Sequence, residues 1–92
     1  MYLQEIPCGG RVLRLKEPLV LRPLLSESGH LLSLEYDELQ IDVFAPTREA
    51  LWAELLEQVR MLWIEYGEAE ESELSPPALR FREVLRSRIV LG

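Results

Sequence analysis

Cysteine and histidine are nearly absent from this 92-residue chain, since each occurs once, as Cys8 and His30. One cysteine cannot form an intramolecular disulfide, and one cysteine with one histidine cannot build a zinc site. No apolar run approaches the roughly 20 residues of a membrane-spanning helix. The uncharged stretch from Ile6 to Gly10 is too short and too polar for a signal peptide. We therefore expect a reduced, cytoplasmic protein with no metal, no cofactor and no membrane segment.

Basic residues are also few, because ten Lys and Arg oppose sixteen Asp and Glu and leave a net charge of −6. The deficit is uneven: residues 68–75 carry four glutamates and no base, whereas residues 76–92 carry four arginines and one glutamate. An acidic body repels phosphate, which disfavours nucleic-acid binding. The arginines of the last segment are expected to form a solvated helix face paired with the glutamates before it. Contact with a phosphate or an acidic partner is the alternative, and Arg82 and Arg86 are its candidate residues.

Alternating apolar and polar residues through residues 1–46 predict half-buried strands. The clearest strand is Leu39 to Ala45, where the odd-numbered residues are all apolar. Gln40 and Asp42 lie on the opposite face, and Phe44 is the exception to the pattern. Turn residues separate the runs, so we expect three to four antiparallel strands joined by short connections.

Helical periodicity follows over residues 47–67, where Thr47 offers an N-cap hydroxyl and Gly67 a helix end. One apolar stripe runs along this segment at spacings of three and four: Leu51, Leu55, Val59, Leu62 and Tyr66. Residues 68–75 then form an acidic connector, and a proline pair starts a C-terminal helix over residues 76–91. The order of elements predicts a single α+β domain over residues 1–92, a small antiparallel sheet followed by two helices, the first packed across the sheet.

Groups suited to catalysis are scarce. His30 falls in a predicted hairpin loop and Cys8 stands beside a glycine turn, so we interpret both as structural or incidental residues. Carboxylates gather along one predicted hairpin, but their spacing selects no acid–base pair or cation site: Glu35, Asp37, Glu38 and Asp42. Acidic edges of this kind also block aggregation between strands. We predict that the protein is not an enzyme, with catalysis by Glu35 or Asp42 as the remaining enzymatic hypothesis.

Large aromatic side chains concentrate on the first predicted helix at Trp52, Trp63 and Tyr66. They widen its apolar stripe beyond what one sheet face can cover. Two interpretations stay open: the rings complete the core, or they anchor a protein partner. With Arg82 and Arg86, these three residues form the predicted partner-binding set.

The segment from Leu39 to Leu51 resembles the last strand and helix start of HicB-like antitoxins, which are small bacterial proteins. It combines an alternating strand, a short turn, a threonine cap, and glutamate and alanine in the first helical turn. Ala50 stands where that family often has a glutamate, and Pro46 where it has a glycine. The resemblance implies a small sheet with a helix across it and a role in binding a protein. The ribbon-helix-helix or helix-turn-helix DNA-binding unit that the family carries is not evident in this sequence.

The leading functional hypothesis is therefore an antitoxin-like interaction protein that binds and masks a basic partner, such as a toxin. The acidic body and the wide aromatic stripe motivate it. The alternative is a homodimeric structural or small-ligand-binding domain without catalytic activity, joined by the second helix or an edge strand.

Overall fold

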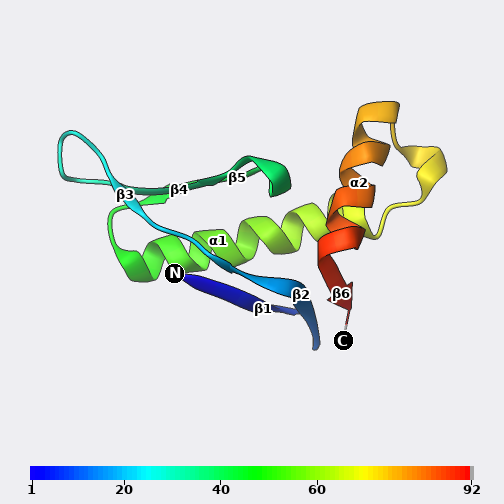
Figure 1. The fold of residues 1–92 in the computed structure, drawn as a ribbon, viewed down its shortest axis with the longest axis horizontal. Coiled ribbons are helices and arrows are strands. Elements are labelled where there is room, and N and C mark those ends of the chain that lie inside the picture. Colours follow the sequence, from blue (N-terminus) through cyan, green and yellow to red (C-terminus); the bar gives the residue numbers. More distant parts are fainter. Residues whose placement is uncertain (92) are drawn as a thin grey trace.

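The computed structural model describes residues 1–91 as two antiparallel sheets with two helices, which confirms the α+β class (Figure 1). The first sheet has the order β1-β2-β6 and the second β3-β4-β5. Their strands are β1 (Tyr2–Cys8), β2 (Arg11–Val20), β3 (Leu24–Leu25), β4 (Leu32–Tyr36), β5 (Ile41–Ala45) and β6 (Ile89–Leu91). The helices are α1 (Arg48–Leu62) and α2 (Pro76–Arg88), with a π turn η2 (Trp63–Gly67) and the 3₁₀ turns η1 (Asp37–Leu39) and η3 (Glu71–Glu73).

Helix α1 lies across the strands, as expected, with β4 and β5 along one flank and β1 along the other (Figure 1). The predicted cap is present, since the Thr47 hydroxyl accepts the Ala50 N–H at 3.1 Å. Leu51, Leu55 and Val59 are buried beneath the sheets. The apolar stripe of the helix therefore supplies the centre of the core.

The first hairpin turns through Gly9 and Gly10, which both have positive φ, 56° and 83°. Two successive residues of this kind make a type I′ turn, whose twist suits a tight hairpin and favours glycine. Along β1, the partner changes from Leu19 to Arg14 between Leu3 and Glu5, so β2 bulges over the intervening residues. That bulge contains Pro18, which has no N–H to give to a ladder.

The predicted C-terminal helix over residues 76–91 is wrong at its end. Helix α2 stops at Arg88, and residues 89–91 form β6, which pairs Ile89 with Leu15 and Leu91 with Leu13. Ile89 is thereby buried at 2% exposure. A β-branched residue gains more from this buried ladder than from another helical turn.

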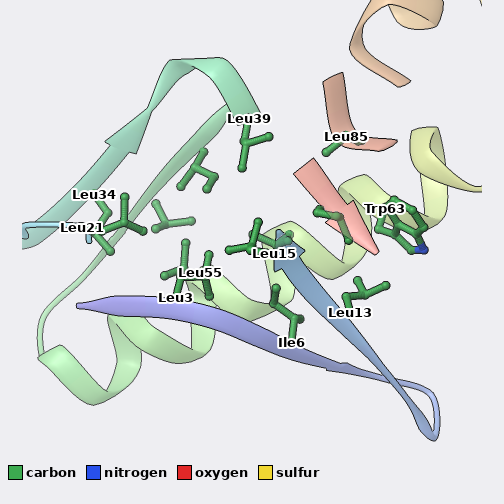
Figure 2. Packing of buried hydrophobic residues seen from close by; sticks show 14 of the residues in the cluster. Leu3, Ile6, Leu13, Leu15, Leu21, Leu34, Leu39, Leu55, Trp63 and Leu85 are labelled. Carbon is green, nitrogen blue, oxygen red and sulfur yellow. The ribbon is translucent and has the colours of Figure 1, made fainter. Parts of the chain in front are cut away.

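The core joins residues from both sheets and both helices into one cluster (Figure 2). Figure 2 labels ten of its members: Leu3, Ile6, Leu13, Leu15, Leu21, Leu34, Leu39, Leu55, Trp63 and Leu85. Cys8 is buried in the same cluster as a free thiol. Over residues 1–91, neither helix has the length and apolarity needed to cross a membrane.

Candidate protein-interaction site

A groove runs between strand β5 and one side of helix α1, and we name it the β5–α1 groove. It encloses about 680 Å³ and is lined by Asp42, Val43, Phe44, Glu54, Glu57, Gln58, Met61, Leu62 and Glu65. Helix α1 contributes Glu54, Gln58 and Met61 at spacings of four and three residues, and Glu65 follows four residues later in η2. Residues at this spacing share one side of a helix, so they form a continuous wall beside the strand.

Strand alternation explains why an aromatic ring faces solvent at this groove. Ile41, Val43 and Ala45 point into the core, so Asp42 and Phe44 point to the outer face of the sheet. Phe44 is 65% exposed, and Met61 across the groove is 50% exposed. The groove therefore offers two apolar side chains to a ligand beside its polar ones.

The charged residues of the groove all carry the same sign. Four carboxylates line it, and no lysine or arginine does: Asp42, Glu54, Glu57 and Glu65. None of the four has an ion-pair partner among residues 1–91. Their fields add over a few ångströms, so the groove attracts a cationic ligand and repels an anionic one.

Strand β5 is an open edge, because its one neighbour in the sheet is β4. Gln58 occupies part of that edge. Its Oε1 accepts the Asp42 N–H at 2.9 Å, and its Nε2 donates to the Asp42 carbonyl at 3.4 Å. A side-chain amide thus takes the place that a peptide group of another strand would take.

Trp63 does not lie on the surface, contrary to the hypothesis that it anchors a partner. It is 5% exposed and belongs to the core cluster. Its Nε1 donates to Glu68 at 2.9 Å, so the one polar atom of the indole is also satisfied within the chain. Tyr66, from the same turn η2, packs its half-buried ring edge-on against Phe81 at 5.4 Å between ring centroids.

Arg82 and Arg86 are likewise engaged within the chain. The Arg82 Nε donates to the Ala69 carbonyl at 2.9 Å, and the Arg86 Nε donates to the Gly67 carbonyl at 2.8 Å. Arg82 also pairs with Glu71 at 3.5 Å, in agreement with the expected pairing to the connector. Both side chains therefore bind α2 to residues 67–71, in the turn and connector that precede it.

Arg88 binds Glu38, a member of the acidic hairpin, and this hydrogen bond raises the pKa of its guanidinium. Two of the four C-terminal arginines, Arg82 and Arg88, are thus ion-paired within the chain, and Arg86 is hydrogen-bonded to a carbonyl. None of these arginines lines the β5–α1 groove.

Trp52 lies apart from the other predicted residues. It is half-buried beside Met1 and Tyr2, where it lines a shallow hollow with Arg48. Six residues separate Trp52 from Gln58, which places them about 120° apart around the helix axis. The predicted partner-binding set consequently does not form one surface.

The residues with catalytic potential are dispersed. His30 is exposed in the loop between β3 and β4, while Cys8 is buried in β1. Among residues 1–91, no three His, Cys, Asp or Glu side chains are grouped so that they could hold a metal ion.

One signal in the sequence does point to the groove. Phe44 breaks the alternation of its strand. It is an aromatic residue on the face where the pattern places polar, solvent-exposed side chains, so the pattern predicts that its ring is exposed. The polar stripe of Glu54, Gln58 and Glu65 is also visible at helical spacing. That Gln58 reaches the main chain of Asp42 depends on how α1 packs, which the sequence does not show.

The chain matches no protein-family model, no curated protein and no solved structure. The resemblance to HicB-like antitoxins therefore stays a prediction.

Proposed function

We propose that this chain is a protein-interaction module that binds and masks a basic protein partner through the β5–α1 groove. One observation carries the proposal: exposed Phe44 and Met61 lie in a groove whose charges are four unpaired carboxylates. Apolar contact supplies affinity, and the carboxylates select a cationic partner and speed its approach.

The antitoxin-like character of this role is supported by where the resemblance falls. Leu39 to Leu51 covers strand β5 and the start of α1, which are the two elements that form the groove. We propose a binding role without catalysis, in the cytoplasm, where the free thiol of Cys8 stays reduced.

The proposal is tested with two variants of equal net charge. The groove variant carries Asp42→Asn, Glu54→Gln, Glu57→Gln and Glu65→Gln. The control variant carries Glu17→Gln, Glu27→Gln, Glu70→Gln and Glu73→Gln, four exposed carboxylates outside the groove. Small basic proteins encoded beside the gene serve as probes in calorimetric titrations.

We expect the groove variant to bind at least about fourfold more weakly than the wild type, because four ion pairs of about 0.2–1 kcal/mol each, together about 0.8–4 kcal/mol, are lost. The control variant should stay within about threefold, the change expected from net charge alone. Equal losses in both variants would show that overall charge, and not the groove, attracts the partner.

A homodimer is the second candidate, and the β3–β4 arm favours it. This arm, residues 24–36, projects from one end of the molecule (Figure 1) and exposes Leu24 and Leu25, each at 65%, next to Val20 at the end of β2, which is 70% exposed. Such a patch would be buried in a self-association through the arm. Sedimentation of the wild type and of Leu24→Ser distinguishes the two: a dimer that Leu24→Ser dissociates supports this candidate.

A further inference from the structure

We infer that the partner of the β5–α1 groove supplies an extended basic strand, which pairs with the open edge of β5 and displaces the Gln58 amide. This inference rests on the proposed function and specifies how the partner binds. Its evidence is the hydrogen-bonding direction of β5, the bonds of Gln58 and the charge of the groove.

The main-chain N–H and C=O groups of one β5 residue, Phe44, are free to pair with an added strand. The Asp42 N–H donates to Gln58, so it points away from β4. In an antiparallel ladder, residues two apart point their main-chain groups the same way. The N–H and C=O of Phe44 therefore also face the groove, where no strand pairs with β5.

At Asp42, the side chain of Gln58 makes the two main-chain hydrogen bonds that a neighbouring strand would otherwise make. One of its bonds is short, at 2.9 Å, and the other is long, at 3.4 Å. A side-chain amide offers one peptide-like pair of groups, whereas an added strand offers such a pair at every second residue. An incoming strand can thus replace Gln58 at Asp42 and also satisfy Phe44.

The lining of the groove determines which side chains the strand carries. Side chains on the α1 side of the strand meet Glu54, Glu57 and Glu65, which favour lysine or arginine with its aliphatic stem along Met61. Side chains on the outer face lie about 5 Å from Phe44, which favours an apolar residue. The pattern is an alternation of basic and apolar residues.

A second copy of this chain fits the edge poorly. Pairing β5 with β5 of another molecule would bring two sets of four carboxylates together, with no base between them. Like charges placed opposite one another destabilise a sheet. Charge complementarity therefore favours a cationic strand from another protein.

The test uses a nine-residue peptide of alternating lysine and valine, with its ends blocked. Two controls accompany it: the same peptide N-methylated at every second residue on its β5-facing N–H groups, and a helix-forming lysine–alanine peptide of equal charge. Affinity is measured by calorimetry against the full chain. We expect both controls to bind at least about tenfold more weakly than the alternating peptide, because neither can complete the ladder.

Variants of the chain test the same contact from the other side. Phe44→Pro removes the outward N–H at an edge position where proline is tolerated, and should weaken binding about tenfold. Phe44→Leu loses the ring but keeps the N–H, so it should weaken binding less than Phe44→Pro, and the difference between the two variants measures the main-chain bond. Gln58→Ala should strengthen binding about threefold to tenfold, since one competing amide is removed, whereas the exposed Gln4→Ala should change nothing. If Phe44→Pro does not fold, the N-methylated peptide decides.

Three outcomes would contradict the inference, and they differ in whether they also contradict the proposed function. Equal affinity of the methylated and unmethylated peptides overturns strand pairing and leaves the proposed function in place. Failure of every cationic peptide and of every basic protein probe overturns both. A Gln58→Ala variant that dimerises without binding the peptide more tightly assigns the edge to a second copy.

Discussion

Gly67 occupies a position that tolerates no side chain. A Cβ built there would lie 2.5 Å from Cε3 of Trp63 and 2.8 Å from its Cδ2. The helical turns end at Gly67, as expected, but its φ is not the positive φ of a typical glycine C-cap, which Gly9, Gly10 and Gly29 have instead. The glycine instead lets the π turn close over a buried indole ring, with the Glu68 N–H bonded to the Trp63 carbonyl at 2.8 Å.

Gly67→Ala should therefore lower the free energy of unfolding by about 1–3 kcal/mol, the usual cost of overpacking a well-filled core. Urea unfolding measures the change. In a Trp63→Leu background the same substitution should cost much less, because the indole ring that the added Cβ would contact is absent. An equal cost in both backgrounds would show that backbone conformation, and not the ring, requires glycine.

At the scale of elements, α2 is attached by arginines that the sequence suggested for partner contact. Arg82 and Arg86 donate to carbonyls of the turn and connector before α2, and the Arg82 side chain is only 15% exposed. Hydrogen bonds from charged donors in this setting contribute more than those of neutral pairs. These bonds hold α2 in the position from which β6 reaches β2.

Arg82→Ala and Arg86→Ala should each reduce the free energy of unfolding by about 1–3 kcal/mol in urea titrations. Arg80→Ala is the matched control, because Arg80 is exposed and its side chain makes no ion pair among residues 1–91, so its change should stay within about 0.5 kcal/mol. Affinity for a basic probe should be the same in all three variants. Loss of that affinity in Arg82→Ala or Arg86→Ala at unchanged stability would restore these arginines as partner contacts.

Local patterns predicted the elements that depend on nearby residues. Alternation predicted a strand over Leu39 to Ala45, and the Thr47 cap marked the start of α1. The strand β5 begins two residues later, at Ile41, because Leu39 ends the 3₁₀ turn η1 and Gln40 has a left-handed backbone. Two features escaped prediction because distant segments decide them. Strand β6 exists because Ile89 finds a partner in Leu15, and the division into two sheets depends on which pairs of strands meet. No local signal distinguishes Ile89 to Leu91 from another helical turn.

The candidate site was predictable only in part, for the same reason. Phe44 was visible as the exception in its strand, and the acidic excess was visible in the composition. The sequence suggested the aromatic residues of the first helical segment as anchors for a protein partner, but one of them, Trp63, lies in the core. Which rings face outward depends on both flanks of α1 being covered, by β5 on one side and by β1 on the other.

For the whole molecule, the balance of charge distinguishes the two ends of the chain. Arg82 and Arg88 are paired with Glu71 and Glu38, and Arg86 donates to a main-chain carbonyl. The four carboxylates of the β5–α1 groove have no ion-pair partner among residues 1–91, and the groove combines their charge with exposed apolar side chains. A molecule built in this way attracts basic surfaces and directs them to one groove.

Chemical-shift mapping of the ¹⁵N-labelled chain during titration with the alternating lysine–valine peptide tests this account most directly. It predicts that the largest shifts fall on residues 42–45 and 54–65, and that the amides of α2 and of the β3–β4 arm stay unchanged. Shifts concentrated on α2 or on the arm, or no saturable shifts at low salt, would contradict the claim that the β5–α1 groove binds a basic partner.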